Sequence, residues 1–171
     1  LVADDFVNQL LYSVWRAGVL CYQLDGSSDL GLPINTSLLG LVGGESFDAL
    51  FPEAKELIIL TDPQEAPTTS LGGEHDLAIL ANKLDVNFYA ELDYRTARAL
   101  GVRVDADIGV DLIFDGNTGE IEVALDMAGD AIQITPVANE LAPEADESVV
   151  EGMSSLLTTA MDTLLGDTLE S

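Results

Sequence analysis

One stretch decides the fold: Val102-Arg103-Val104-Asp105-Ala106-Asp107-Ile108-Gly109-Val110-Asp111-Leu112-Ile113-Phe114. Apolar residues occupy every second position, polar residues or glycine stand between them, and only Ile113 breaks the pattern. Because successive side chains of a strand point to opposite faces, the pattern predicts one long strand with an apolar face and an acidic face. A strand of this length must twist, so it belongs to a curved antiparallel sheet whose apolar face is covered.

Shorter strands are expected on both sides of this stretch, with an acidic and glycine-rich turn at 115–119 that leads into a partner strand. The segment 62–67 contains Pro63 and Pro67 and must be an edge or a crossing loop, since proline donates no hydrogen bond to a ladder. The expected strands are 19–25, 57–60, 75–81, 86–92, 120–125 and 132–134.

Two apolar helices are expected at the ends of the sequence. The first begins at Asp4 or Asp5 and runs to about Ala17, with Gly18 placed to end it, and its apolar stripe must be buried. The last begins after Pro143, where acidic residues suit the helix dipole. Between the first helix and the sheet, 26–44 is expected as an extended loop or a short 3₁₀ piece, followed by a helical turn at 47–51.

These elements predict an α+β fold with a long, strongly twisted antiparallel sheet and two apolar helices that pack on it. The length of 171 residues suits one domain over 1–171, with neither a repeat nor a linker. A helix-grip fold, with a curved sheet over one long C-terminal helix, is the alternative. The sequence does not begin with Met, so we expect an excised fragment or a processed protein from which any signal peptide has gone.

The charge is extreme, because 6 Lys and Arg stand against 31 Asp and Glu, for a net charge of −25. Such a surface repels nucleic acid and anionic membranes. The acidity is read as a device for solubility, with a calcium-rich surface as the alternative. No apolar run approaches the ~20 residues of a membrane-spanning helix, so no transmembrane segment is expected.

The sequence lacks the residues of a catalytic site. The lone histidine, His75, is expected to be exposed and idle, because no serine lies in a nucleophile-elbow context. The lone cysteine, Cys21, is expected to be buried and inert. Neither a zinc cluster nor a glycine-rich phosphate loop is present, so no enzyme, no metal site and no cofactor are predicted.

The acidic face of the long strand admits two interpretations. Asp105, Asp107 and Asp111, with Glu120 and Glu122 on the partner strand, supply oxygen ligands that could hold calcium. Carboxylates spaced two apart on a flat strand diverge, however, so a solvated face is favoured. The last helix also admits two interpretations. Its Met and Leu residues fit an ordinary core or the compliant wall of an apolar cavity.

Several residue strings resemble a known family. The opening DDFVNQLLYSVWRAGVL, residues 4–20, is similar to the start of the second barrel of the bactericidal/permeability-increasing protein and lipopolysaccharide-binding protein family. The step Leu50-Phe51-Pro52, the prolines at 63 and 67, and the position of the closing helix also match. The resemblance is to the tubular lipid-binding superfamily.

This resemblance implies a twisted sheet wrapped around the helices, with an elongated apolar tunnel that holds a lipid or other apolar ligand without catalysis. It also implies an extracellular or cell-envelope location, and a second barrel or a homodimer, because the chain has the length of one barrel. The net charge of −25 is opposite to that of a cationic, endotoxin-neutralising module. The alternative function is a structural or protein-interaction domain with a fully packed core.

The ligand-binding residues are predicted by position on the three expected walls. They are Phe6, Leu10 and Val14 on the first helix; Phe88, Val104, Ile108 and Val110 on the sheet; and Leu157 and Met161 on the last helix.

Overall fold

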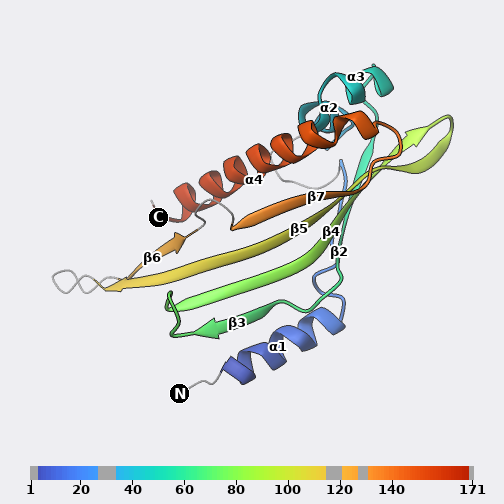
Figure 1. Cartoon of the computed structure of the whole chain (residues 1–171). Helices are drawn as coiled ribbons and strands as arrows, with labels where there is room; N and C mark the ends of the chain where they lie inside the picture. Colours follow the sequence, from blue (N-terminus) through green and yellow to red (C-terminus); the bar gives the residue numbers. More distant parts are fainter. Residues whose placement is uncertain (1–3, 27–33, 115–120, 127–130, 170–171) are drawn as a thin grey trace. The chain divides into compact units, whose positions relative to one another are not determined.

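The computed structural model describes residues 4–26, 34–114, 121–126 and 131–169, in which helices accompany a large antiparallel sheet (Figure 1). The α+β class predicted from the sequence is confirmed. The packing of the backbone divides the chain into two compact units. Unit 1 comprises 1–22, 61–85 and 103–133, and unit 2 comprises 23–60, 86–102 and 134–171.

The described strands pair into one open sheet. In chain order they are β1 (Gln23–Leu24), β2 (Leu57–Pro63), β3 (Thr68–Leu71), β4 (Leu77–Leu92), β5 (Arg95–Phe114), β6 (Ile121–Asp126) and β7 (Ile132–Ala138). The pairing order is β1-β2-β4-β5-β6, with β3 also paired to β4 and β7 also paired to β5. The strands β2, β4, β5 and β7 each contribute residues to both units.

The longest strand is β5, whose 20 residues contain the alternating stretch and begin at Arg95 rather than at Val102. The expected partner strand is confirmed as β6, and their register places Val110 opposite Leu125 and Leu112 opposite Val123. The predicted turn at 115–119 lies outside the described residues. The expected strand at 132–134 is confirmed as part of β7, which also pairs with β5.

The prediction of two separate strands at 75–81 and 86–92 is wrong, because the structure has one strand, β4, of 16 residues. Lys83 in its middle has a positive φ of 54°, and its N–H donates to Asp105 Oδ1 at 2.8 Å rather than to a backbone carbonyl. This irregularity is typical of a β-bulge, which interrupts side-chain alternation while the strand continues. The side-chain alternation is therefore interrupted at Lys83, although the strand continues.

The turn between β4 and β5 has two central residues, Asp93 and Tyr94, with φ of 47° and 64°. Positive φ at both positions is the requirement of a type I′ hairpin turn, whose twist matches that of the strands it joins. The Tyr94 side chain is 95% exposed.

The segment before β4 also differs from expectation. The sheet continues through Pro63 at the end of β2, and the short strand β3 follows the second proline and pairs with β4, Leu71 opposite Leu77. The sequence Thr68-Thr69-Ser70 has no apolar alternation, so the pattern gave no sign of a strand there. Of the expected strand 19–25, only Gln23–Leu24 pairs with β2.

Unit 2 contains the helices α2 (Ser37–Gly43), α3 (Glu45–Leu50) and α4 (Asp146–Leu169), and the 3₁₀ helix η1 (Pro143–Ala145). The final helix and the helical turn near 47–51 are confirmed. The loop expected over 26–44 is wrong where α2 forms; residues 27–33 lie outside the described residues.

The glycines of α2 favour a loop in the sequence. In the structure, α2 is a helix, and a glycine on α4 allows the two helices to pack closely. A Cβ on Gly152 of α4 would lie 2.3 Å from the carbonyl oxygen of Val42 in α2, so the two helices approach at a distance that only glycine permits. Val149, one turn earlier on α4, is fully buried. The α2–α4 contact therefore depends on a position without a side chain.

A packed core fills unit 2. Its buried apolar residues include Leu39, Val42, Phe47, Leu57, Phe88, Leu100, Val102, Ile134, Val149 and Met153. Among the described residues, the buried apolar side chains of unit 1 are those of Pro63, Val104 and Val110. Unit 2 therefore has the interior of an ordinary small domain, and unit 1 does not.

Candidate apolar ligand site

The first helix of unit 1, α1 (Asp4–Arg16), begins and ends where the sequence predicts, and Gly18 follows it with a φ of 72°. It lies along β3 (Figure 1). Although the sequence predicts that its apolar stripe is buried, none of its residues is. Its apolar residues Val7, Leu11 and Trp15 are only half-buried, so apolar packing alone does not account for the position of this helix.

Polar side chains fix α1 to the free edge of the sheet. The Asn8 amide accepts a hydrogen bond from the Thr69 N–H at 2.7 Å and donates to the Thr69 carbonyl at 2.9 Å. An added strand would make the same pair of backbone bonds, so Asn8 occupies the edge of β3 as a strand would. The Trp15 indole N–H donates to the carbonyl of Pro63 at 2.7 Å.

The predicted row Phe6, Leu10 and Val14 is left open by this arrangement. Phe6 is 64% exposed, Leu10 is 55% exposed, and Val14 is half-buried. The spacing i, i+4, i+8 places the three side chains on one face of the helix. A soluble helix normally buries such a face, so this row is an apolar surface without a cover among the described residues of the protein.

The apolar face of β5 in unit 1 is covered only in part. Val104 and Val110 are buried and Ile108 is half-buried, whereas Leu112 and Phe114 at the end of the strand are exposed. These five residues alternate along one strand face, as predicted. The predicted residues Phe6, Leu10, Val14, Val104, Ile108 and Val110 thus belong to one unit, in which apolar surface remains accessible.

The other predicted ligand-binding residues belong to unit 2. Phe88 is buried in its packed core, and Leu157 on α4 is half-buried. The side chain of Met161 lies outside those that the structure describes. Their part in a ligand site stays a prediction.

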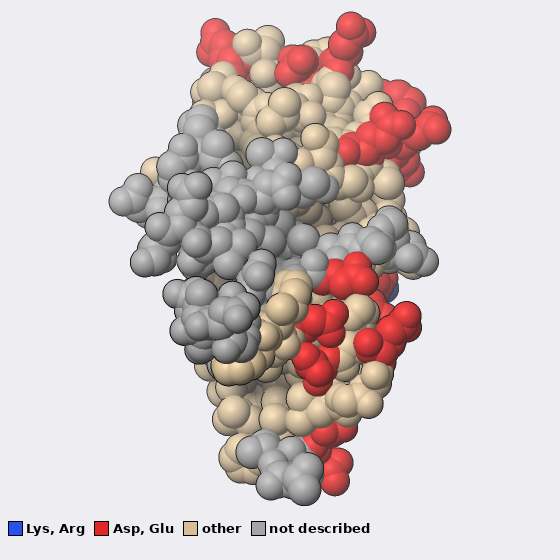
Figure 2. Space-filling model, turned by 90° about the vertical axis from the view of Figure 1, so that its left-hand side faces the viewer, with Lys and Arg blue, Asp and Glu red and all other residues tan. Residues whose placement is uncertain are grey.

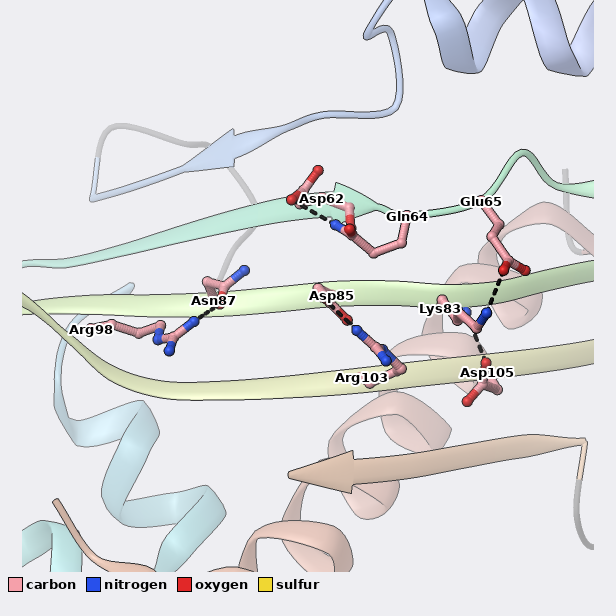
Figure 3. A network of polar contacts seen from close by, with 9 residues as sticks. All are labelled: Asp62, Gln64, Glu65, Lys83, Asp85, Asn87, Arg98, Arg103 and Asp105. Atoms are coloured by element: carbon pink, nitrogen blue, oxygen red, sulfur yellow. Dashed lines mark hydrogen bonds and ion pairs between the residues drawn. The ribbon is translucent and has the colours of Figure 1, made fainter. Parts of the chain in front are cut away.

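The opposite face of β4 and β5 explains the alternating charges of the long strand (Figure 3). In unit 1, the Arg103 guanidinium donates two hydrogen bonds to Asp85, at 2.7 and 2.9 Å, and this contact raises the pKa of Arg103. Asp105 accepts the N–H of Lys83, whose ammonium also pairs with Glu65. The acidic face therefore pairs with its neighbours on β4 and is not simply solvated.

His75 is not exposed, contrary to the prediction. Its ring is half-buried, and Nδ1 lies 3.0 Å from Asp111 Oδ2 on β5. That hydrogen bond, with the charges of nearby carboxylates, raises the pKa of His75. The same hydrogen bond, with one from the Asp76 N–H, lowers the pKa of Asp111. Sequence reasoning missed the pair because the alternation places Asp111 on a face but does not say which turn packs against it.

Two further expectations concern reactive or metal-binding groups. Cys21, expected to be buried, is exposed, because the residues around it form no strand that would cover it. The described residues hold no group of acidic, histidine or cysteine side chains arranged to bind a metal ion. The acidic turn at 115–120 lies outside the described part of the chain.

Comparison with known proteins gives a similarity in structure but none in sequence. No family model matches the sequence, and no curated protein matches it either. The fold is similar to that in the crystal structure of lipopolysaccharide binding protein, with a TM-score of 0.50 and 12% sequence identity over 78% of this chain and 34% of that one. The chain thus spans about a third of the length of that protein.

This likeness shows a remote relationship in fold. The tunnel and the wrapping of the sheet around the helices stay predictions. None of the helices in the described part of the chain combines the length and hydropathy needed to cross a membrane.

Proposed function

We propose that the chain binds a lipid or another apolar small molecule, without catalysis, on the apolar surface of unit 1. The observation that carries this proposal is the open row Phe6, Leu10 and Val14 on a helix that polar contacts hold in place. Covering such a row with acyl chain yields roughly 0.8 kcal/mol for each buried methylene group. The likeness in fold to lipopolysaccharide binding protein supports the same class of ligand.

The walls of the proposed site are the residues of α1 and of the apolar face of β5. They are Phe6, Leu10, Val14, Val104, Ile108 and Val110. The role of Phe88, Leu157 and Met161, which belong to unit 2, stays a prediction from the sequence. Because Asn8 and Trp15 fix the backbone of α1, the open row keeps its position when no ligand covers it. A preformed apolar surface lowers the entropy cost of binding.

The charge of the protein restricts the ligand's head group. Figure 2 shows one face of the molecule, on which Asp and Glu side chains stand in several groups and Lys and Arg are barely visible. With a net charge of −25, a densely anionic head group is repelled. The proposed ligand is therefore neutral, zwitterionic or weakly charged, and the proposed setting of the protein is extracellular or in the cell envelope.

A fluorescent fatty acid and a zwitterionic phospholipid test the proposal in a titration of the full chain. We expect saturable binding that weakens about tenfold or more in Phe6→Ser and in Leu10→Ser, since each change removes apolar contact worth about 1.5–3 kcal/mol. Tyr94→Ser is the matched control, because Tyr94 is an exposed aromatic residue of unit 2. Equal binding by all variants, or none by the wild type, contradicts the proposal.

The packed core of unit 2 favours a second candidate function, a structural or protein-interaction domain. In that case the open row of α1 would contact a protein partner or a second copy of the chain. Absence of lipid binding, together with a dimer that Leu10→Ser dissociates, would establish this alternative.

A further inference from the structure

The His75 side chain links the turn between β3 and β4 to both β5 and β6. One ring nitrogen, Nδ1, lies 3.0 Å from Asp111 Oδ2 on β5. The other, Nε2, lies 3.7 Å from Asp126 Oδ2 on β6. The ring therefore bridges two carboxylates from two strands, and all three groups belong to unit 1.

The position of the ring is shaped by the strand beneath it. A Cβ built on Gly109 of β5 would lie 2.4 Å from Cδ2 of His75, so the ring fills the space that a side chain would take. The ring also borders a cavity of about 460 Å³, together with Ser70, Glu74, Asp107 and Gln133. The imidazole is thus held by shape as well as by charge.

Hydrogen bonds from backbone N–H groups to side-chain carboxylates also join this turn to β5. The Asp76 N–H donates to Asp111 Oδ1 at 3.1 Å, and Asp76 Oδ2 accepts the N–H of Leu112 at 2.9 Å. Within the turn, the Gly72 N–H donates to the Asp76 carbonyl at 3.1 Å. These three amides report on whether the turn is seated against β5.

Among the described residues, the charged groups that border the ring are acidic. They are Glu74 from the turn, Asp107 and Asp111 from β5, and Asp126 from β6. A protonated ring donates from Nδ1 to Asp111 and attracts Asp126 with its charge. A neutral ring keeps one N–H for Asp111 and loses its attraction for Asp126.

We propose that His75 is a pH-sensitive clasp, which holds the β3–β4 turn against β5 and β6 while its ring is protonated and loosens the turn when the ring is neutral. As His75 is the only histidine, its side chain accounts for the titration of this turn near neutrality.

The pH window follows from the two partners. The pKa of His75 is raised above 6.5, so its contribution to stability is complete below pH 6.5 and is lost as the pH rises through the folded value. The pKa of Asp111 is lowered below 3.8, so its contribution is present above pH 3.8 and is lost as the pH falls through the folded value. The clasp is therefore strongest between about pH 4 and 6.5.

Nuclear magnetic resonance of the full chain tests this proposal without a ligand. We expect the His75 ring to titrate above 6.5, and the amides of Gly72, Asp76 and Leu112 to lose protection from hydrogen exchange through the same midpoint. The exchange rates are corrected for intrinsic base catalysis. The Thr69 amide, which donates to Asn8, is the control and keeps its protection.

Two variants separate the clasp from general loss of structure. His75→Gln retains a polar side chain and removes the titrating ring, so the pH step in turn protection should vanish. Asp126→Asn leaves the turn and β5 intact and should lower the His75 titration midpoint toward 6.5. A ring that titrates at or below 6.5, turn protection that is constant with pH, or an unchanged step in His75→Gln would overturn the proposal.

Discussion

The two units of this protein bury their apolar side chains to very different extents. In unit 2, helices α2, α3 and α4 surround fully buried residues such as Leu39, Phe47 and Val149. In unit 1, α1 is held by Asn8 and Trp15, and its apolar row is exposed. Apolar residues therefore form a packed core in unit 2, whereas in unit 1 much of their surface stays exposed.

The difference shows that apolar periodicity and burial are separate properties. The rows of α1 and α4 follow the same helical spacing, and both predict a buried stripe. What distinguishes them is the partner: α4 packs on α2 at Gly152, whereas α1 uses its polar side chains against a strand edge. Mutations in the two units should therefore change different measurable quantities.

The largest contrast is expected from the same substitution in each unit. Phe47→Ala should lower the free energy of unfolding by about 3–5 kcal/mol, because Phe47 is fully buried and its loss leaves a cavity. Phe6→Ala should change it by less than about 0.5 kcal/mol, because Phe6 is exposed. Denaturant unfolding monitored by circular dichroism measures both. Equal losses of unfolding free energy in the two variants would contradict the difference in burial between the units.

A smaller effect is expected at the closest helix contact of unit 2. Gly152→Ala should destabilise the protein by about 1–3 kcal/mol, because the new methyl group would overlap the α2 backbone at Val42. Gly73→Ala is the control, since nothing lies within 4 Å of a Cβ at that turn position. Thermal unfolding should separate the two variants, and a neutral Gly152→Ala would mean that α2 and α4 do not pack this closely.

The smallest effect on stability is expected where α1 meets β3. Asn8→Ala leaves the N–H and carbonyl of the buried residue Thr69 without their side-chain partner, and should cost about 1–2 kcal/mol. Gln9→Ala, at the next and exposed position, should be neutral. The hydrogen-exchange rate of the Thr69 amide measures the loss of this contact directly. Unaltered protection there would show that Asn8 does not dock the helix.

Much of the fold could be predicted from the sequence because its pattern is local. The alternation in β5, the limits of α1 and the acidic start of α4 follow from residues near one another in the chain. The bulge at Lys83 could not be predicted, because the acceptor of its N–H is Asp105 on the neighbouring strand. Helix α2 was missed because its glycines, Gly40 and Gly43, are explained by the close approach of Asp48 and Phe47 of α3, which the sequence pattern does not show.

The candidate site could likewise be predicted from the sequence only in part. The row on α1 was predicted as a ligand wall from its spacing, but its exposure depends on Asn8 and the edge of β3, which periodicity does not reveal. The contacts of His75 with Asp111 and Asp126 were not foreseen, because a turn and two strands must first come together. The part of the predicted site on α4 stays a prediction.

The central claim is that unit 1 binds an apolar small molecule. Mass spectrometry of the protein as purified, first under native conditions and then after extraction with organic solvent, tests it most directly. We predict a stoichiometric adduct of lipid-like mass that is lost on denaturation and is reduced in Leu10→Ser. A bare protein mass, together with no uptake of fluorescent fatty acid or phospholipid, would contradict the claim.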